Sequence, residues 1–163
     1  MLNGKAGILI IDDDAGIRKT LSKILDREGY FVRDVENGQQ AIAASKERFF
    51  NVALIDIRLP DIEGTKLLDK LEETEPKMVK IIVTGFPSLQ NAIEAVNQGA
   101  DGYILKPFDV KELLKMIENH LKKQEEDLEY TQERVTEYIT TRVKQLELEK
   151  TQEQPSRKSQ EQH

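Results

Sequence analysis

The stretch that decides the fold is Asn51-Val52-Ala53-Leu54-Ile55-Asp56-Ile57-Arg58-Leu59-Pro60-Asp61-Ile62-Glu63-Gly64. Its four consecutive apolar residues, 52–55, predict a strand buried on both faces, and such strands are typical of parallel sheets covered by helices. Asp56 stands where the apolar run ends, and Pro60 and Gly64 indicate a loop directly after it. We therefore expect Asp56 at the carboxyl end of a strand, the edge of an open α/β sheet at which ligands bind.

The rest of the chain repeats this pattern. Further apolar runs predict strands at 6–11, 31–35, 80–84 and 102–105, and residues with helical apolar spacing follow each of them. Asp14, Ser88 and Asp109 are expected to cap helices, the last in a capping box with Glu112. Five strand–helix units predict an α/β fold: a flavodoxin-like (βα)5 doubly wound parallel five-stranded sheet, strand order 2-1-3-4-5, with a long C-terminal helical extension.

The third of these helices is expected to carry Leu67, Leu68 and Leu71 and to end before Pro76. The last helix is expected to continue to about Lys150, because helix formers dominate there and Gly and Pro are absent.

We accordingly divide the chain into a domain at 1–122, a helical extension at 123–150 and a disordered tail at 151–163. Apolar residues recur every seven positions at Leu121, Leu128 and Val135, until Arg142 interrupts the heptad. In a shifted register an apolar stripe continues through Val135, Ile139, Val143 and Leu146. A coiled-coil homodimer and a lone solvated helix both remain open.

Composition excludes several classes of protein. The 163 residues include no cysteine and only two distant histidines, so a disulfide framework and a zinc cluster are excluded. The net charge of −6, with no block of basic residues, argues against direct nucleic-acid binding. The sequence has no apolar stretch long enough for a membrane span or a signal peptide, so we expect a cytoplasmic protein without membrane contact.

Polar residues gather at the expected carboxyl edge of the sheet. Asp12 and Asp13 end the first strand, Asp56 the third, Thr84 the fourth and Lys106 the fifth. Three converging carboxylates repel one another unless positive charge compensates them, and Lys106 with Mg²⁺ would do so. Oxygen ligands alone select a hard cation. A metal, a lysine and a hydroxyl together suit the transfer of a phosphoryl group to a carboxylate nucleophile.

Four motifs in this order resemble the receiver domain of two-component response regulators over residues 5–122: Ile8-Leu9-Ile10-Ile11-Asp12-Asp13-Asp14, Leu54-Ile55-Asp56 through Gly64, Val83-Thr84-Gly85, and Tyr103-Ile104-Leu105-Lys106-Pro107-Phe108. The resemblance implies that Asp56 accepts a phosphoryl group from a sensor histidine kinase in a Mg²⁺-dependent reaction. Asp13 would bind the metal directly, Asp12 through water, and the Arg58 backbone carbonyl would complete the set.

The same resemblance implies that Lys106 pairs with the phosphoryl group and that Thr84 moves to bond it, with Tyr103 as the switch aromatic. The chain would be a signalling domain and not an enzyme, and phosphorylation would alter a face built from the fourth helix, fifth strand and fifth helix. Arg58 stands where the family varies, at a position that affects access of water to the acyl phosphate.

Several readings of the whole chain stay open. It fits a stand-alone receiver without a DNA-binding domain, and it also fits an N-terminal receiver fragment of a longer signalling protein or transcription regulator. A more distant alternative is a metal-dependent aspartyl phosphohydrolase, but Arg58 stands where such an enzyme would need an acid. A dimerising scaffold in which the acidic residues have no role is the last alternative.

Overall fold

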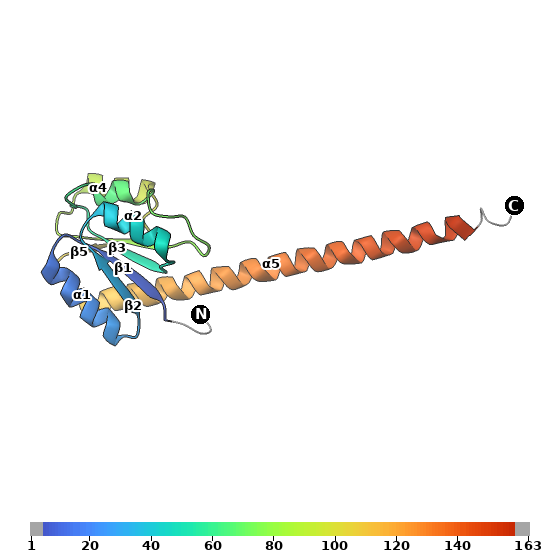
Figure 1. The fold of residues 1–163 in the computed structure, drawn as a ribbon, viewed down its shortest axis with the longest axis horizontal. Coiled ribbons are helices and arrows are strands. Elements are labelled where there is room, and N and C mark those ends of the chain that lie inside the picture. Colours follow the sequence, from blue (N-terminus) through green and yellow to red (C-terminus); the bar gives the residue numbers. More distant parts are fainter. Residues whose placement is uncertain (1–4, 159–163) are drawn as a thin grey trace. The chain divides into compact units, whose positions relative to one another are not determined.

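A single parallel sheet organises the molecule. In the computed structural model, which describes residues 5–158, five strands pair in the order β2-β1-β3-β4-β5 (Figure 1). They are β1 (Gly7–Ile11), β2 (Phe31–Val35), β3 (Val52–Ile55), β4 (Val79–Thr84) and β5 (Gly102–Leu105). Ile11 pairs with Ile55, so β1 and β3 end in register; Ile55 pairs with Ile82, and β4 continues two residues further, to Thr84. The predicted fold class and strand order are confirmed.

Helices cover both faces of the sheet because neighbouring residues of a buried strand point to opposite sides. Ile8 and Ile10 of β1 pack with residues of α1 (Ala15–Arg27) and of the start of α5 (Val110–Lys158). Leu9 and Ile11 pack on the other face, against residues of α2 (Gly38–Glu47), α3 (Gly64–Leu67) and α4 (Leu89–Asn97). The apolar runs of the sequence thus supply two cores.

The predicted helix caps at Asp14, Ser88 and Asp109 are present, but among the described residues no bond from the Glu112 side chain completes the predicted capping box. The Asp14 carboxylate accepts hydrogen bonds from the N–H groups of Gly16 and Ile17 at the start of α1, and Ser88 Oγ accepts one from Asn91 at the start of α4. Asp109 Oδ1 accepts a hydrogen bond of 2.8 Å from the Lys111 N–H. These bonds satisfy amide groups that have no partner within the helix.

Helix α3 is shorter than the sequence suggests. It ends at Leu67, whereas the leucine spacing predicts a helix that reaches Leu71 and stops before Pro76. The Lys70 N–H bonds to the Leu67 carbonyl three residues back, so the chain tightens into a turn there. The buried Lys80 of β4 donates from Nζ to the Leu68 carbonyl at 2.5 Å, which satisfies one end of the shortened helix from outside. Burial lowers the pKa of this lysine.

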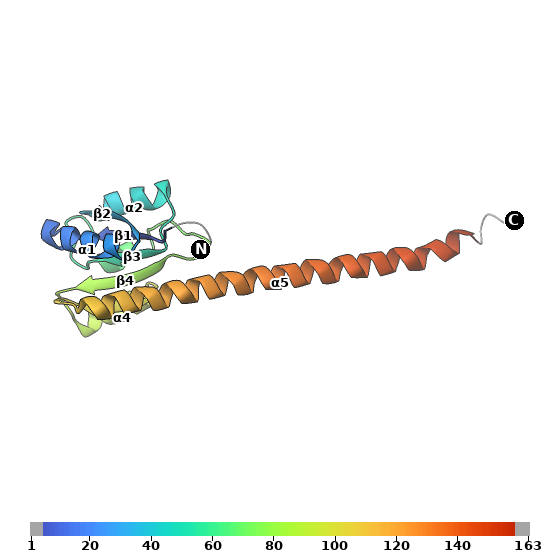
Figure 2. The ribbon, with the colours of Figure 1, turned by 90° about the horizontal axis from the view of Figure 1, so that it is seen from below.

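Helix α5 is a single continuous helix (Figure 2), and its residues belong to two compact units. One unit ends at Glu125 and the second begins at Glu126, three residues beyond the predicted domain boundary at 122. The helix continues to Lys158 instead of ending near Lys150, and it includes Pro155, a residue that ordinarily interrupts a helix. Of the predicted disordered tail, 151–158 are therefore helical and 159–163 lie outside the described residues. Among the described residues, no helix is both long and apolar enough to cross a membrane.

A buried pair of side-chain amides fixes α5 within the first unit. Asn51 Nδ2 donates to Gln124 Oε1 at 2.9 Å, and Gln124 Nε2 donates to the backbone carbonyls of Asn51 and Lys77 at 3.1 and 2.8 Å. Asn51 Oδ1 in turn accepts the Gly7 N–H at 2.9 Å. Asn51 and Gln124 are both buried, so these bonds join the beginnings of β1 and β3 to α5 without competition from water.

Candidate phosphoacceptor site

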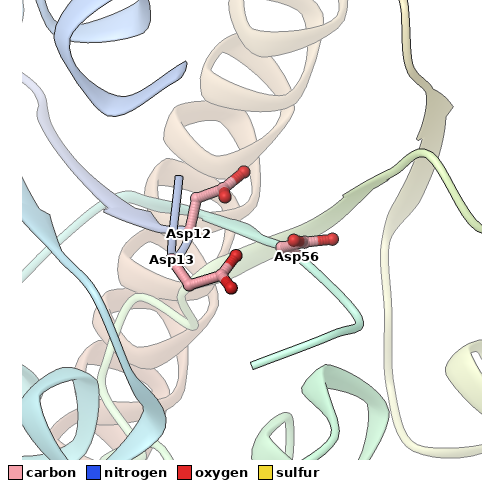
Figure 3. Close-up of side chains that lie close together, drawn as sticks. All are labelled: Asp12, Asp13 and Asp56. Carbon is pink, nitrogen blue, oxygen red and sulfur yellow. The ribbon is translucent and has the colours of Figure 1, made fainter. Parts of the chain in front are cut away.

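Three carboxylates meet at the carboxyl edge of the sheet (Figure 3). Asp12 and Asp13 follow β1, and Asp56 follows β3. One carboxylate oxygen from each residue lies within 4.8 Å of the others. Asp12 and Asp56 are buried and Asp13 is exposed. The Asp56 N–H donates to the Ile11 carbonyl at 2.9 Å, so the parallel pairing of β1 and β3 itself places these side chains together.

Lys106 brings a positive charge to this cluster. Its Nζ lies 2.6 Å from Asp12 Oδ2 and 3.6 Å from Asp56 Oδ2. Its backbone N–H donates to the Thr84 carbonyl at 2.8 Å, which extends the pairing of β4 with β5 by one residue. The sequence prediction that Asp12, Asp13, Asp56 and Lys106 converge is therefore matched by the geometry.

Asp56 has the properties of a carboxylate that is short of partners. Burial raises its pKa, the Lys106 ammonium acts in the opposite direction, and the charges of Asp12 and Asp13 raise it further. The Arg58 backbone N–H also acts to lower the pKa of Asp56, but Oδ1 is buried without a hydrogen bond of normal geometry among the described residues. A buried oxygen without a partner costs free energy, so this atom favours an incoming positive or electrophilic group.

The donor set fits a magnesium ion. It consists of carboxylate oxygens only, from two buried residues and one exposed residue, and one buried oxygen of Asp56 is unsatisfied. Hard cations prefer such ligands, and Mg²⁺ usually takes one or two carboxylates and keeps several waters. The single exposed carboxylate, Asp13, leaves one side of the cluster open to solvent.

Thr84 is fully buried at the end of β4. Its Oγ1 accepts a hydrogen bond of 3.1 Å from the Phe86 N–H two residues later. The hydroxyl hydrogen remains free to donate, because this bond uses only a lone pair of the oxygen. Any rotation of the Thr84 side chain would have to release the Phe86 N–H.

Arg58 lies over Phe86 near the same edge. The guanidinium carbon is 3.7 Å from the centre of the Phe86 ring, and both side chains are exposed. The sequence pattern points to Arg58 but not to Phe86, whose only signal in the sequence is an aromatic residue in the loop directly after Thr84. The stack joins the loop after β3 to the loop after β4, and a cation over an aromatic face stabilises such a contact.

Gly64 was also missed as a residue that shapes the site. A Cβ atom there would collide with the Asp56 backbone carbonyl, and the Gly64 N–H donates to the Ile57 carbonyl at 2.7 Å. The loop after β3 therefore folds back tightly onto the backbone of Asp56, which only a residue without a side chain permits.

Tyr103 lies in β5, and its ring is half-buried. Burial raises the pKa of its hydroxyl, and the Ser88 backbone amide acts in the opposite direction. The hydroxyl oxygen is buried without a hydrogen bond of normal geometry in the part of the chain described. The strand pairing places Tyr103 beside Ile82, two residues before Thr84.

The chain matches the family model described as response regulator receiver domain over residues 8–118. It is 38% identical over 114 residues to "DNA-binding transcriptional regulator NtrC" of Proteus hauseri, which covers 70% of this chain and 24% of that protein. It is 33% identical over 121 residues to "Transcriptional regulatory protein ZraR" of Salmonella typhimurium, which covers 74% of this chain and 27% of that protein. The chain thus spans about a quarter of the length of these curated relatives.

A solved structure also matches. It is the response regulator receiver domain protein (CheY-like) from Methanospirillum hungatei JF-1, with a TM-score of 0.73 and 44% identity. The match covers 76% of this chain and 99% of that chain. The similarity therefore covers the sheet and its helices but not the full length of α5.

Proposed function

Because this chain belongs to the response regulator receiver family of two-component systems, we propose that it accepts a phosphoryl group on Asp56 from a sensor histidine kinase. The observation that carries the proposal is the buried Asp56 carboxylate, with one unpartnered oxygen, beside the Lys106 ammonium. One carboxylate oxygen would form the new bond to phosphorus while the bond from phosphorus to the kinase imidazole nitrogen breaks. The products are an acyl phosphate and a free imidazole.

The neighbouring residues have separate roles in this proposal. Lys106 would exchange part of its contact with Asp12 for an oxygen of the phosphoryl group, since its Nζ already lies 3.6 Å from Asp56. Thr84 would donate its hydroxyl hydrogen to another phosphoryl oxygen after release of the Phe86 N–H. Tyr103 would serve as the aromatic residue that responds to this change.

Four groups would hold Mg²⁺: the carboxylates of Asp12, Asp13 and Asp56 and the backbone carbonyl of Arg58, with Asp12 acting through water. When bound, the metal supplies positive charge that neutralises the phosphoryl oxygens. Without that charge, Lys106 alone faces three carboxylates, so we expect phosphorylation to depend on Mg²⁺.

The proposed output face is apolar and exposed. Leu89, Ile93 and Val96 of α4 are 78%, 52% and 71% exposed, and Leu105 of β5 is 50% exposed. Large apolar side chains gathered on one surface favour contact with a partner or a second copy. Phosphorylation of Asp56 would shift the equilibrium between two conformations of this face, built from α4, β5 and the start of α5.

The relatives' names bear on what a longer protein would do. NtrC of Proteus hauseri is a DNA-binding transcriptional regulator about four times as long as the matched region. A receiver that works alone, without nucleic-acid contact, and a receiver that belongs to a longer transcription regulator are both compatible with our proposal for Asp56. The cytoplasmic location predicted from the sequence is also part of the proposal.

The test is phosphorylation of the full chain by a small phosphodonor such as acetyl phosphate. We expect labelling with Mg²⁺, no labelling after its chelation, and no labelling of Asp56→Asn. Asp69→Asn is the matched control, because it removes an exposed aspartate outside the cluster and should label like the unchanged protein. Undiminished labelling of Asp56→Asn would refute the assignment, and circular dichroism would establish that the variant is folded.

A further inference from the structure

The second unit of the chain carries an exposed apolar stripe. Val135, Ile139 and Leu146 of α5 are 52%, 55% and 42% exposed, and Leu128 is partly exposed. An isolated helix without tertiary contacts is only marginally stable in water, and burial of an apolar face supplies most helix stability in proteins. We therefore expect the stripe to be buried against another apolar surface.

Heptad spacing identifies the residues that would meet a partner helix. Leu128, Val135 and Arg142 are seven residues apart, and Gln132, Ile139 and Leu146 form a second series four residues later. Such alternation of four and three residues is the spacing of the two core positions of a coiled coil. Two of the six positions are polar, and Arg142 is permanently charged.

The charge of this helix is unequal along its length. Residues 126–137 contain five acidic residues and one basic residue, a net charge of −4 (Glu126, Asp127, Glu129, Glu133, Glu137; Arg134). Residues 138–152 contain three basic and two acidic residues, a net charge of +1 (Arg142, Lys144, Lys150; Glu147, Glu149). The acidic half of one helix is therefore complementary in charge to the basic half of a second helix, whereas two acidic halves repel each other.

From the stripe and this charge distribution we infer that the second unit pairs with the same segment of a second copy in antiparallel orientation. Leu128 then faces Leu146 of the second copy, and Val135 faces its Ile139. Gln132 faces Arg142 of the second copy, so that the guanidinium can donate to the amide oxygen of the glutamine. The acidic half of each helix lies along the weakly basic half of the other.

A parallel pair of helices has neither the contact between Gln132 and Arg142 nor the pairing of acidic with basic halves. It would place Arg142 against Arg142 of the second copy, and like charges at a helix interface are costly. A shift of register to Val143 would avoid that contact. Both parallel registers, however, align the acidic halves, with a net charge of −4 on each helix. This inference concerns α5 alone and does not depend on phosphorylation of Asp56.

Disulfide trapping tests the orientation, because the chain has no cysteine of its own. The probes are two full-length variants, Leu128→Cys and Leu146→Cys, oxidised separately and as a mixture. In the antiparallel pair, residue 128 lies about 27 Å along the helix from residue 128 of the second copy, too far for a disulfide. We expect cross-linking only in the mixture, between the two different variants.

A disulfide formed by Leu128→Cys alone would show a parallel pair and overturn the inference. So would a dimer in which the mixture does not cross-link, or a monomeric mass of the unchanged chain in light scattering at every concentration.

A second variant leaves the apolar stripe intact. Glu129→Lys combined with Glu133→Lys should weaken an antiparallel dimer several-fold, since it removes the complementary charge. The same change would strengthen a parallel dimer, which would contradict the inference. Added salt should likewise weaken the unchanged dimer.

Discussion

Replacing Asp13 by Asn should stabilise the metal-free protein. In the cluster, a carboxylate oxygen of Asp13 lies within 4.8 Å of one from Asp12 and one from Asp56. Two unit charges at this distance repel by about 0.9 kcal/mol in water and by about 3.5 kcal/mol at the effective dielectric of a protein surface. Asp13 is exposed, so the lower value applies more closely, and Lys106 offsets part of the repulsion. We expect a net gain of about 1 kcal/mol in the free energy of unfolding.

Magnesium should reverse which of the two proteins, the unchanged chain or Asp13→Asn, has the higher free energy of unfolding. A ligand that binds only the folded state at about 100 times its Kd stabilises that state by about 2.7 kcal/mol. The unchanged protein should therefore gain stability as Mg²⁺ is added, whereas Asp13→Asn, with one carboxylate fewer, should gain much less. At saturating Mg²⁺ the unchanged protein is expected to be the more stable of the two.

Amide hydrogen exchange in β3 is the appropriate assay, because these buried amides exchange only when the first unit opens as a whole. Asp26→Asn is the matched control, since Asp26 is an exposed aspartate of α1 outside the cluster, and it should change stability by less than about 0.5 kcal/mol. If Asp13→Asn were less stable without metal, or responded to Mg²⁺ like the unchanged protein, the electrostatic account of the cluster would be wrong.

Three further predictions follow from the structure. Burial raises the pKa of Asp56, so the ionised carboxylate lowers the stability of the folded protein at neutral pH. This loss of stability is recovered as the pH falls through the raised pKa and the carboxylate is protonated. Asp56→Asn should therefore stabilise the metal-free protein more at neutral pH than at mildly acidic pH, as measured by urea unfolding. Gly64→Ala should cost about 1–3 kcal/mol or more and slow phosphorylation, because its Cβ meets the Asp56 carbonyl, whereas Gly85→Ala, with only ordinary contacts, should be tolerated in the same assays. Gln124→Ala should cost about 2–4 kcal/mol in urea unfolding through the loss of three hydrogen bonds of a buried side chain, and the exposed Gln39→Ala of α2 about 0.5 kcal/mol or less.

The sequence predicts the sheet and the site cluster well because both depend on local signals. Each buried strand is a short apolar run, and the first charged residue after it marks the carboxyl end. Parallel strands in register bring these ends together, so Asp12, Asp13, Asp56 and Lys106 could be grouped before any coordinates were known. Their chemical roles stay predictions, since geometry alone assigns no reaction.

Other features could not be predicted because they depend on contacts between distant segments. Next to the early end of α3, the amine of Lys80, a lysine inside a strand, reaches the Leu68 carbonyl. The stack of Arg58 on Phe86 depends on the paths of two loops that have no periodicity. The end of α5 was also not predicted, because the sequence pattern suggests a stop near Lys150, ahead of Pro155, whereas the helix runs through this proline to Lys158.

The amide pair of Asn51 and Gln124 determines where this protein can be divided. The family match ends at residue 118 and the apolar pattern suggests a boundary at 122, yet Gln124 lies beyond both. A fragment cut at either point would leave the Asn51 amide and the Lys77 carbonyl without their bonds to Gln124. A domain for use in a fusion protein must therefore extend through residue 125. A fusion joined before that residue would lose stability within the first unit itself, whatever the attached domain.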